Sequence, residues 1–247
     1  MGTLALDIET ATPFDSTFDG SRTETLGWVA IALAYDSGDE SPESTVFLRR
    51  GDWSDEHTAD LFDRFLDWCD GRAIDTMLTY NGAAFDLLHL RNWARQVASA
   101  DLSPDAPQRL EQLAEHHVDI ALAAADTYAT ELRPSQSILP DFKAYQLADI
   151  DNKTIRYAAY ELPSAYLTAA GIDSDFVQGK HVGMALGERY VEGVVAGLEG
   201  TKTHGELESL LVDYCYSDIL DLFTLYERLG GATLKPEYTV PLAAIER

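Results

Sequence analysis

Two acidic residues near the amino terminus have the spacing of a metal-binding pair. Asp7 and Glu9 lie two residues apart in LALDIET, at the carboxyl end of an apolar run. Because side chains alternate along a strand, both are expected on one face. Adjacent carboxylates repel each other and resist losing water unless a cation or hydrogen bonds offset that cost. The pair is therefore a candidate divalent-metal site, with an exposed strand end as the alternative.

A third acid, Asp86, follows the turn in YNGAAFD and begins a predicted helix. Leu90, Trp93 and Val97 recur behind it at helical spacing, so its carboxylate is expected to point inward. An acid in a first helical turn also favours the helix dipole and often caps the helix. A purely structural role therefore stays open for Asp86.

The fourth acid, Asp218, lies on the apolar face of a long helix predicted over about 206–229. Few acids occupy such a face without a partner. Tyr214 lies one turn earlier, where its phenol could orient a water molecule or merely pack. Asp221 has polar helical neighbours instead, which predicts a position at the surface.

The order and spacing of these residues resemble the DEDD exonucleases of the ribonuclease H-like superfamily. The resemblance is to the tyrosine-bearing branch, which includes the proofreading domains of family B DNA polymerases, and within it to stand-alone exonuclease-like proteins more than to a polymerase fragment. DIET at 7–10, NGAAFD at 81–86 and YCYSD at 214–218 look like its three motifs. The likeness covers about 1–98 and 206–230. The histidine-bearing branch would need a histidine where Asp213 stands.

The resemblance implies a metal-dependent 3′→5′ exonuclease acting on single-stranded DNA or RNA. Asp7, Glu9 and Asp218 would hold one ion, and Asp7 and Asp86 would help to place a second. Tyr214 would position the attacking water. Oxygen-only ligands suit Mg²⁺ or Mn²⁺ better than zinc.

Residues beside the motifs are expected to contact the terminal nucleotide, namely Thr10, Asn81 and Phe85. Asn81 and Phe85 also have ordinary alternative roles, in a turn and in the core. None of the six histidines fits the motifs. Surface or capping positions are expected for His116, His117 and His204.

The strands and helices expected to position these residues indicate an α/β, ribonuclease H-like fold. Its central mixed five-stranded sheet would combine a three-stranded antiparallel meander with two parallel strands, flanked by helices. Hydrophobic periodicity and turn residues place the elements. Strands are predicted at 4–8, 25–35, 44–48 and 74–80, and helices at about 54–71, 84–97 and 206–229. The stretch 110–125 is expected to mix a helix with a fifth strand at 118–122. We expect a single domain over 1–247 with a helical insertion at about 130–203.

The charge balance is strongly acidic, with 42 acidic against 18 basic residues and a net charge of −24. Only five residues are lysine. A densely carboxylated surface stays hydrated in high salt, which favours a halophilic protein in which most acids serve solvation. Hydrophobic residues make up 46% of the chain, so disorder is not expected.

The predicted insertion is less acidic than the remainder. Residues 133–202 hold seven basic and nine acidic residues, a net of −2, and four of the five lysines. Lys153 and Arg156 could therefore contact phosphates, with nearby aromatic residues stacking on bases. The alternative is an ordinary insertion whose aromatics form core: Phe142, Tyr145, Tyr157, Tyr160, Tyr166 and Phe176.

Cys69 and Cys215 are the two cysteines, which predicts reduced core thiols and a cytoplasmic protein. No apolar run is long enough to cross a membrane, and no export leader is recognised. Three other functions stay open: a ribonuclease H-like endonuclease, a non-catalytic nucleic-acid-binding module, and an acidic scaffold without specific metal binding.

Overall fold

The strands of the chain form one mixed sheet of order β3-β2-β1-β4-β5. The computed structural model describes residues 2–12, 19–39 and 41–245. The central strand β1 is antiparallel to β2 and parallel to β4, and β4 is parallel to β5. The strands are β1 (Gly2–Ala11), β2 (Gly27–Asp36), β3 (Glu43–Leu48), β4 (Ile74–Thr79) and β5 (His117–Asp119).

The predicted meander and the two parallel strands are confirmed. The fifth strand is shorter than predicted over 118–122. It ends at Asp119, whose carboxylate accepts the backbone N–H of Ala121 at 3.1 Å. This bond caps α4 (Ile120–Thr127), so helix replaces the rest of the predicted strand.

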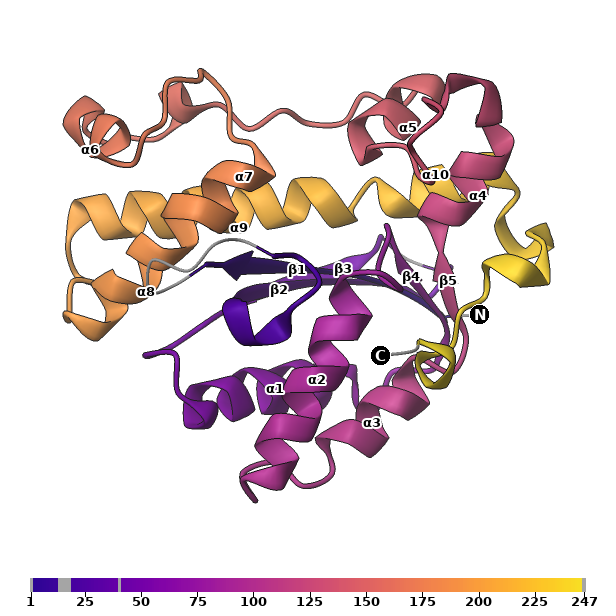
Figure 1. Cartoon of the computed structure of the whole chain (residues 1–247), viewed down its shortest axis with the longest axis horizontal. Helices are drawn as coiled ribbons and strands as arrows, with labels where there is room; N and C mark the ends of the chain where they lie inside the picture. The colour runs from indigo at the N-terminus through magenta and orange to yellow at the C-terminus, as the bar shows by residue number, and fades with distance from the viewer. Residues whose placement is uncertain (1, 13–18, 40, 246–247) are drawn as a thin grey trace.

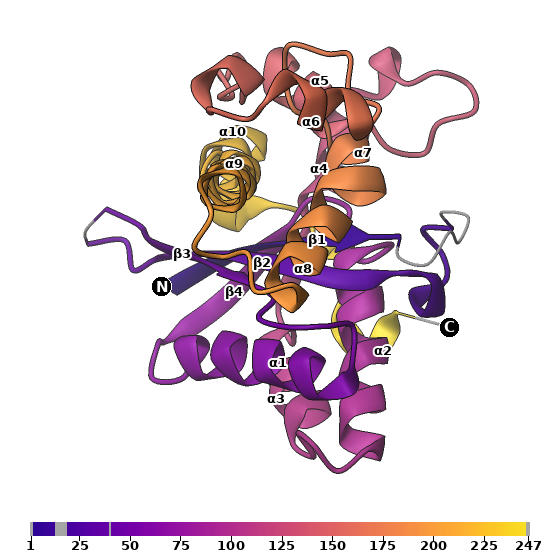
Figure 2. The ribbon, with the colours of Figure 1, turned by 90° about the vertical axis from the view of Figure 1, so that its left-hand side faces the viewer.

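Helices cover both faces of the sheet (Figures 1 and 2). Leu4, Leu6 and Ile8 of β1 pack on one side, whereas Ala5 faces the other. This alternation buries both faces and leaves Asp7 and Glu9 on the side of Ala5. The first side is covered by α1 (Asp55–Cys69), α2 (Asp86–Ser99) and α3 (Ala106–Leu113), and the second by α8 (Gly187–Val195) and α9 (Lys202–Ile219).

The long helix predicted over 206–229 is two helices, because α9 ends at Ile219 and α10 spans Leu222–Leu229. Asn152 holds the break: its side-chain amide donates to the Ser217 carbonyl at 2.9 Å and to Asp221 Oδ2 at 3.0 Å. Asp221 is therefore half-buried and hydrogen-bonded, rather than solvated as predicted.

The segment at 130–203 contributes short helices on the side of α9 and α10 that faces away from the sheet (Figures 1 and 2). These are α5 (Asp141–Leu147) and α6 (Ser164–Ala169). Next come α7 (Gly179–His181) and a π-helical turn at Val182–Leu186. The turn reaches β1, because the N–H of Thr12 donates to the Gly183 carbonyl at 3.0 Å. Such wide turns are frequent at functional sites.

Two further sequence predictions concern single features. Cys69 and Cys215 are buried free thiols, as predicted. Within residues 2–12, 19–39 and 41–245, no helix combines the length and apolarity needed to cross a membrane.

Candidate metal centre

Three predicted carboxylates from distant parts of the chain meet at one point. Asp7 and Glu9 come from the carboxyl end of β1, and Asp218 comes from the last turn of α9. One carboxylate oxygen of each lies within 4.8 Å of the others. All three side chains are half-buried, so a small cation could reach the oxygens from solvent.

Asp86 lies next to this group but outside it. β4 pairs with β1 only from Gly2 to Ala5, so the rest of this edge of β1 has no strand beside it. Asp86 closes the gap: its Oδ1 accepts the backbone N–H of Ile8 at 3.0 Å, and the residue is 3% exposed. One oxygen of the acid therefore fixes the stretch of β1 that carries Asp7 and Glu9.

Burial and neighbouring acids raise the pKa values of all four carboxylates. Burial is the main cause for each of them, and it lifts the pKa of Asp7 and of Glu9 well above the usual range. Burial and neighbouring Asp141 raise the pKa of Asp218 to about 7. Burial also raises that of Asp86 to about 7, against the lowering effect of the Ile8 hydrogen bond.

No basic side chain among the described residues forms an ion pair with any of the four acids. Hydrogen bonds from Ile8 to Asp86 and from Ser217 to Asp218 offset part of their mutual repulsion, and protonation or a bound cation would offset the rest. An oxygen-only donor set of this kind fits a hard divalent ion.

The Tyr214 phenol lies beside the carboxylates as a neutral donor. Burial raises its pKa well above the usual range, and Glu9, Asp218 and Asp7 raise it further. α7 closes over it, because a Cβ added at Gly179 would lie 3.4 Å from the phenol oxygen. The hydroxyl therefore stays protonated at neutral pH and can donate to an oxygen at the site.

A hollow on each side of the acids offers room for a ligand. The first, of about 250 Å³, is lined by Asp7, Asn81, Asp141 and Asp218, among others. The second, of about 340 Å³, is mostly apolar and adjoins Glu9. Its walls are Ile8, Glu9, Thr10, Phe85, Gly179, Lys180, Gly183 and Met184.

Three predicted substrate residues line these hollows. Thr10 and Phe85 lie beside Glu9. Asn81 has a φ of 64°, and Asp119 accepts its N–H at 2.8 Å and that of Ala83 at 3.1 Å. Asn81 thus has its expected place in a tight turn as well as a position in the wall.

Two charged residues of the walls, Asp141 and Lys180, were not among the predicted site residues, although Lys180 is one of the lysines counted in the less acidic segment. Both belong to the segment without motif resemblance. Asp141 follows Pro140 at the start of α5, and no periodic pattern distinguishes it from the many surface acids. Its charge contributes to the raised pKa values of Asp7, Glu9 and Asp218.

The predicted phosphate contacts Lys153 and Arg156 are exposed, and neither lines the two hollows beside the acids. Arg156 pairs in an isolated bridge with Phe176. The aromatic side chains of the segment include both buried and exposed ones. Tyr145 and Tyr157 lie in the core, whereas Phe142 is 66% exposed and Phe176 is 42% exposed. The core alternative thus holds for these two tyrosines.

Two of the three histidines expected at the surface or as caps are buried instead. His117 contacts the Thr79 hydroxyl at 2.7 Å and the Val240 carbonyl at 2.8 Å, which joins two strands and the carboxyl-terminal segment. The His204 ring contacts the Tyr190 carbonyl at 3.1 Å. His116 is exposed, as expected.

No protein-family model and no curated protein matches the sequence. Among solved structures, the chain is similar to the family B DNA polymerase of the archaeon Pyrobaculum calidifontis, with 18% identity and a TM-score of 0.51 over 99% of this chain and 26% of the polymerase. Escherichia coli exonuclease I in complex with a dA16 oligonucleotide is also similar, with 17% identity and a TM-score of 0.39 over 85% of this chain and 43% of that one.

The chain thus spans about a quarter of the polymerase and less than half of the exonuclease. The likeness to the polymerase, together with the strand order, confirms the predicted ribonuclease H-like α/β fold. At this level of identity it shows the fold alone.

Proposed function

We propose that this chain is a metal-dependent 3′→5′ exonuclease acting on single-stranded DNA or RNA. The observation that carries the proposal is the convergence of Asp7, Glu9 and Asp218 within 4.8 Å, without a basic partner, on a ribonuclease H-like sheet. The direction of cleavage rests on the motif resemblance. The similarity of the chain to a polymerase and to an exonuclease also supports a nuclease.

Asp7, Glu9 and Asp218 would hold Mg²⁺ or Mn²⁺, and Asp7 with Asp86 would place a second ion. A pair of such ions supplies an activated water and stabilises the leaving oxygen. Asp86 has its second oxygen for this role, because the first accepts the Ile8 N–H. Asp141, across the same hollow, would bind the water shell of an ion on the Asp7 side, since Mg²⁺ keeps several waters.

The remaining residues would orient the substrate. Tyr214, held neutral by its surroundings, donates a hydrogen bond that aligns the attacking water. The mostly apolar hollow beside Glu9 receives the terminal nucleotide against Thr10 and Phe85, and Lys180 lies where it can meet a phosphate. Contacts of this kind hold the scissile bond in position for attack. None of them adds a negative charge to the strongly acidic surface.

Single-stranded DNA and RNA labelled at the 5′ end, incubated with Mn²⁺ or Mg²⁺ in molar salt, test the proposal. We expect a ladder of products shortened from the 3′ end, which Asp218→Asn abolishes. Internal fragments would favour an endonuclease. Binding without cleavage would indicate a non-catalytic module. If calorimetry detects no specific divalent binding, the metal-centre proposal fails.

A further inference from the structure

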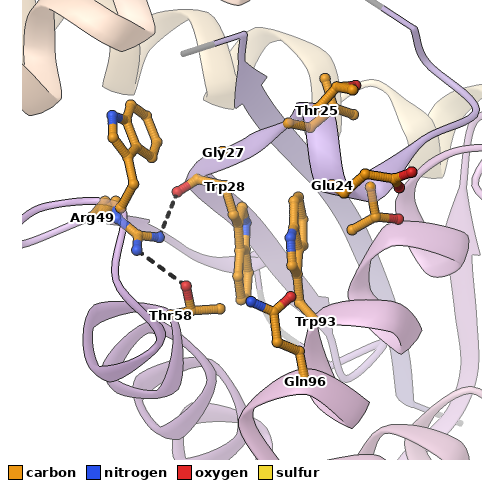
Figure 3. A pocket seen from close by; sticks show the side chains of 11 residues that line it. Glu24, Thr25, Gly27, Trp28, Arg49, Thr58, Trp93 and Gln96 are labelled. Carbon is orange, nitrogen blue, oxygen red and sulfur yellow. Dashed lines mark hydrogen bonds between the residues drawn. The ribbon is translucent and has the colours of Figure 1, made fainter. Parts of the chain in front are cut away.

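A third hollow, of about 350 Å³, lies on the other side of the sheet from α9, between the start of β2 and helices α1 and α2 (Figure 3). Tryptophans dominate its walls. Trp28 and Trp93 are stacked, with ring centroids 5.5 Å apart and planes within 3°. The third, Trp53, is half-buried. Three of the four tryptophans of the chain line this one hollow.

The Trp53 ring is held against the backbone of β2. A Cβ at Gly27 would lie 2.3 Å from its ring carbons, so only glycine permits this contact. The Arg49 guanidinium lies 5.3 Å from the ring centroid on the same wall. A fixed indole beside a cation is a platform on which a planar base can stack.

Arg49 gives the hollow a buried positive charge. The residue is 1% exposed, and it donates to the carbonyls of Trp28, Asp52 and Ser54 and to the Thr58 hydroxyl. Figure 3 shows the bonds to Trp28 and Thr58. All of these acceptors are neutral, so no carboxylate contacts the guanidinium among the described residues. Asp52, Asp55 and Asp60 lie near enough to act on the guanidinium and Glu24 lines the hollow, so the site favours an electron-rich aromatic group over a bare anion.

A row of packed rings at the start of α2 and along it, with His89 fully buried, gives the distance between this hollow and the proposed active site. Phe85, in the wall beside Glu9, packs on His89 with centroids 4.6 Å apart, and His89 packs on Trp93 at 5.7 Å. Eight residues of helix rise about 12 Å. A stacked strand advances about 3.4 Å per nucleotide, so roughly four nucleotides or fewer span this distance.

We propose that the hollow framed by Trp28, Trp53 and Trp93 is a second nucleotide subsite, which takes an unpaired base of the bound strand upstream of its 3′ end. This inference rests on the proposed function for the identity of the strand. The stacking surface of the hollow is Trp53, which is half-buried, whereas Trp28 and Trp93 are as deeply buried as Tyr145 and Tyr157 of the 130–203 segment. An acidic protein in high salt needs such a surface, because salt weakens phosphate contacts steeply.

Tryptophan fluorescence tests the subsite directly. Asp218→Asn serves as the parent so that oligonucleotides are not consumed, and oligodeoxyadenylates of two to ten nucleotides are titrated with Mn²⁺ in molar salt. We expect quenching to begin once the oligonucleotide is roughly four nucleotides long. In that background, Trp53→Leu should weaken binding of the ten-nucleotide strand roughly five- to a hundred-fold, the range for losing one stacked base.

Trp68→Leu is the matched control. Trp68 is also half-buried, and the Arg72 guanidinium lies 3.8 Å from its ring centroid, but it lines neither this hollow nor the two beside the acids. Its removal should leave affinity unchanged. Gln96→Phe, on the surface of α2, should fill the hollow and weaken binding even if Trp53→Leu does not fold.

Parent-like affinity in Trp53→Leu or Gln96→Phe, or equal quenching by the dinucleotide, would overturn the subsite even if the wild-type chain degrades the strand. Length-dependent binding lost in Trp53→Leu would support it even if the wild-type chain cleaves nothing, in which case the proposed function alone fails. An absence of any oligonucleotide binding would overturn both.

Discussion

The backbone N–H of Ile8 donates to Asp86 Oδ1 at 3.0 Å, so the acid of the second motif closes the open edge of the strand that carries the first. Asp86 is therefore a structural anchor as well as a proposed ligand. The two roles use different properties of the side chain, because the hydrogen bond needs an oxygen and an ion needs a charge.

Substitutions at Asp86 should separate these roles. In Asp86→Asn the amide oxygen can still accept the Ile8 N–H, so we expect parent-like stability with activity reduced roughly 10- to 100-fold or more. Asp86→Ala leaves a buried N–H unpaired and should cost a further 1–3 kcal/mol or so of unfolding free energy. Urea denaturation and a nuclease assay measure the two effects. Equal stability of the two variants would show that the hydrogen bond contributes nothing.

The metal-free protein should lose stability as pH rises from about 4 to about 7. Folding raises the pKa of Asp86 and Asp218 to about 7, so the folded chain binds more protons than the unfolded chain in this window. We expect a Tm several degrees lower at pH 8 than at pH 5, since 1 kcal/mol shifts Tm by about 2–4 °C in a chain of this size. Molar KCl should suppress the effect of general surface charge.

Two controls assign this pH dependence to the site. Asp218→Asn should show a shallower decline of Tm, because it removes one of the titrating groups. Mn²⁺ at pH 8 should raise the Tm of the parent by binding the folded state. An identical decline in Asp218→Asn would place the pH dependence elsewhere in the molecule.

Asp141 should contribute to metal affinity although it lies outside the three motifs. Asp141→Asn removes one charge from the hollow shared with Asp7 and Asp218, and we expect Mn²⁺ affinity to fall roughly 10-fold by calorimetry. Asp151→Asn is the matched control: it makes the same charge change at an exposed position ten residues further along the chain that does not line this hollow. If both variants bind alike, Asp141 acts only through net charge.

Lys180 should contribute more to substrate binding than Lys153 and Arg156. It lines the hollow beside Glu9, whereas the other two line neither of the hollows beside the acids. We expect Lys180→Glu to raise KM for a single-stranded oligonucleotide about 10-fold in low salt, with the difference shrinking as salt increases. The double variant K153E/R156E is the comparison. A larger rise of KM in the double variant would instead support the phosphate contacts of Lys153 and Arg156 that the sequence predicts.

The sheet and the meeting of three acids were predictable because they depend on local patterns. Alternation in β1 determines that Asp7 and Glu9 share a face, and helical periodicity places Asp218 on the buried side of its helix. The first four strands follow from apolar runs ended by turn residues. These signals lie within a few neighbouring residues, so the sequence carries them without tertiary information.

The errors came from side chains that act across long stretches of the chain. The break between α9 and α10 depends on Asn152, and the early end of β5 on the carboxylate of Asp119. His117 is buried by partners in β4 and near the carboxyl terminus. No local pattern reports such contacts. Asp141 was missed because an acid is unremarkable in this composition.

The helical phase of α9 limits how this chain can vary. Tyr214 and Asp218 share one face of a helix that continues to Ile219, and each residue turns the helix by about 100°. Inserting one residue between them would turn the Asp218 carboxylate away from β1, although all residues of the three motifs would still be present in the sequence. Homologues with an altered count there would therefore be expected to have lost the reaction, even where their acids are retained.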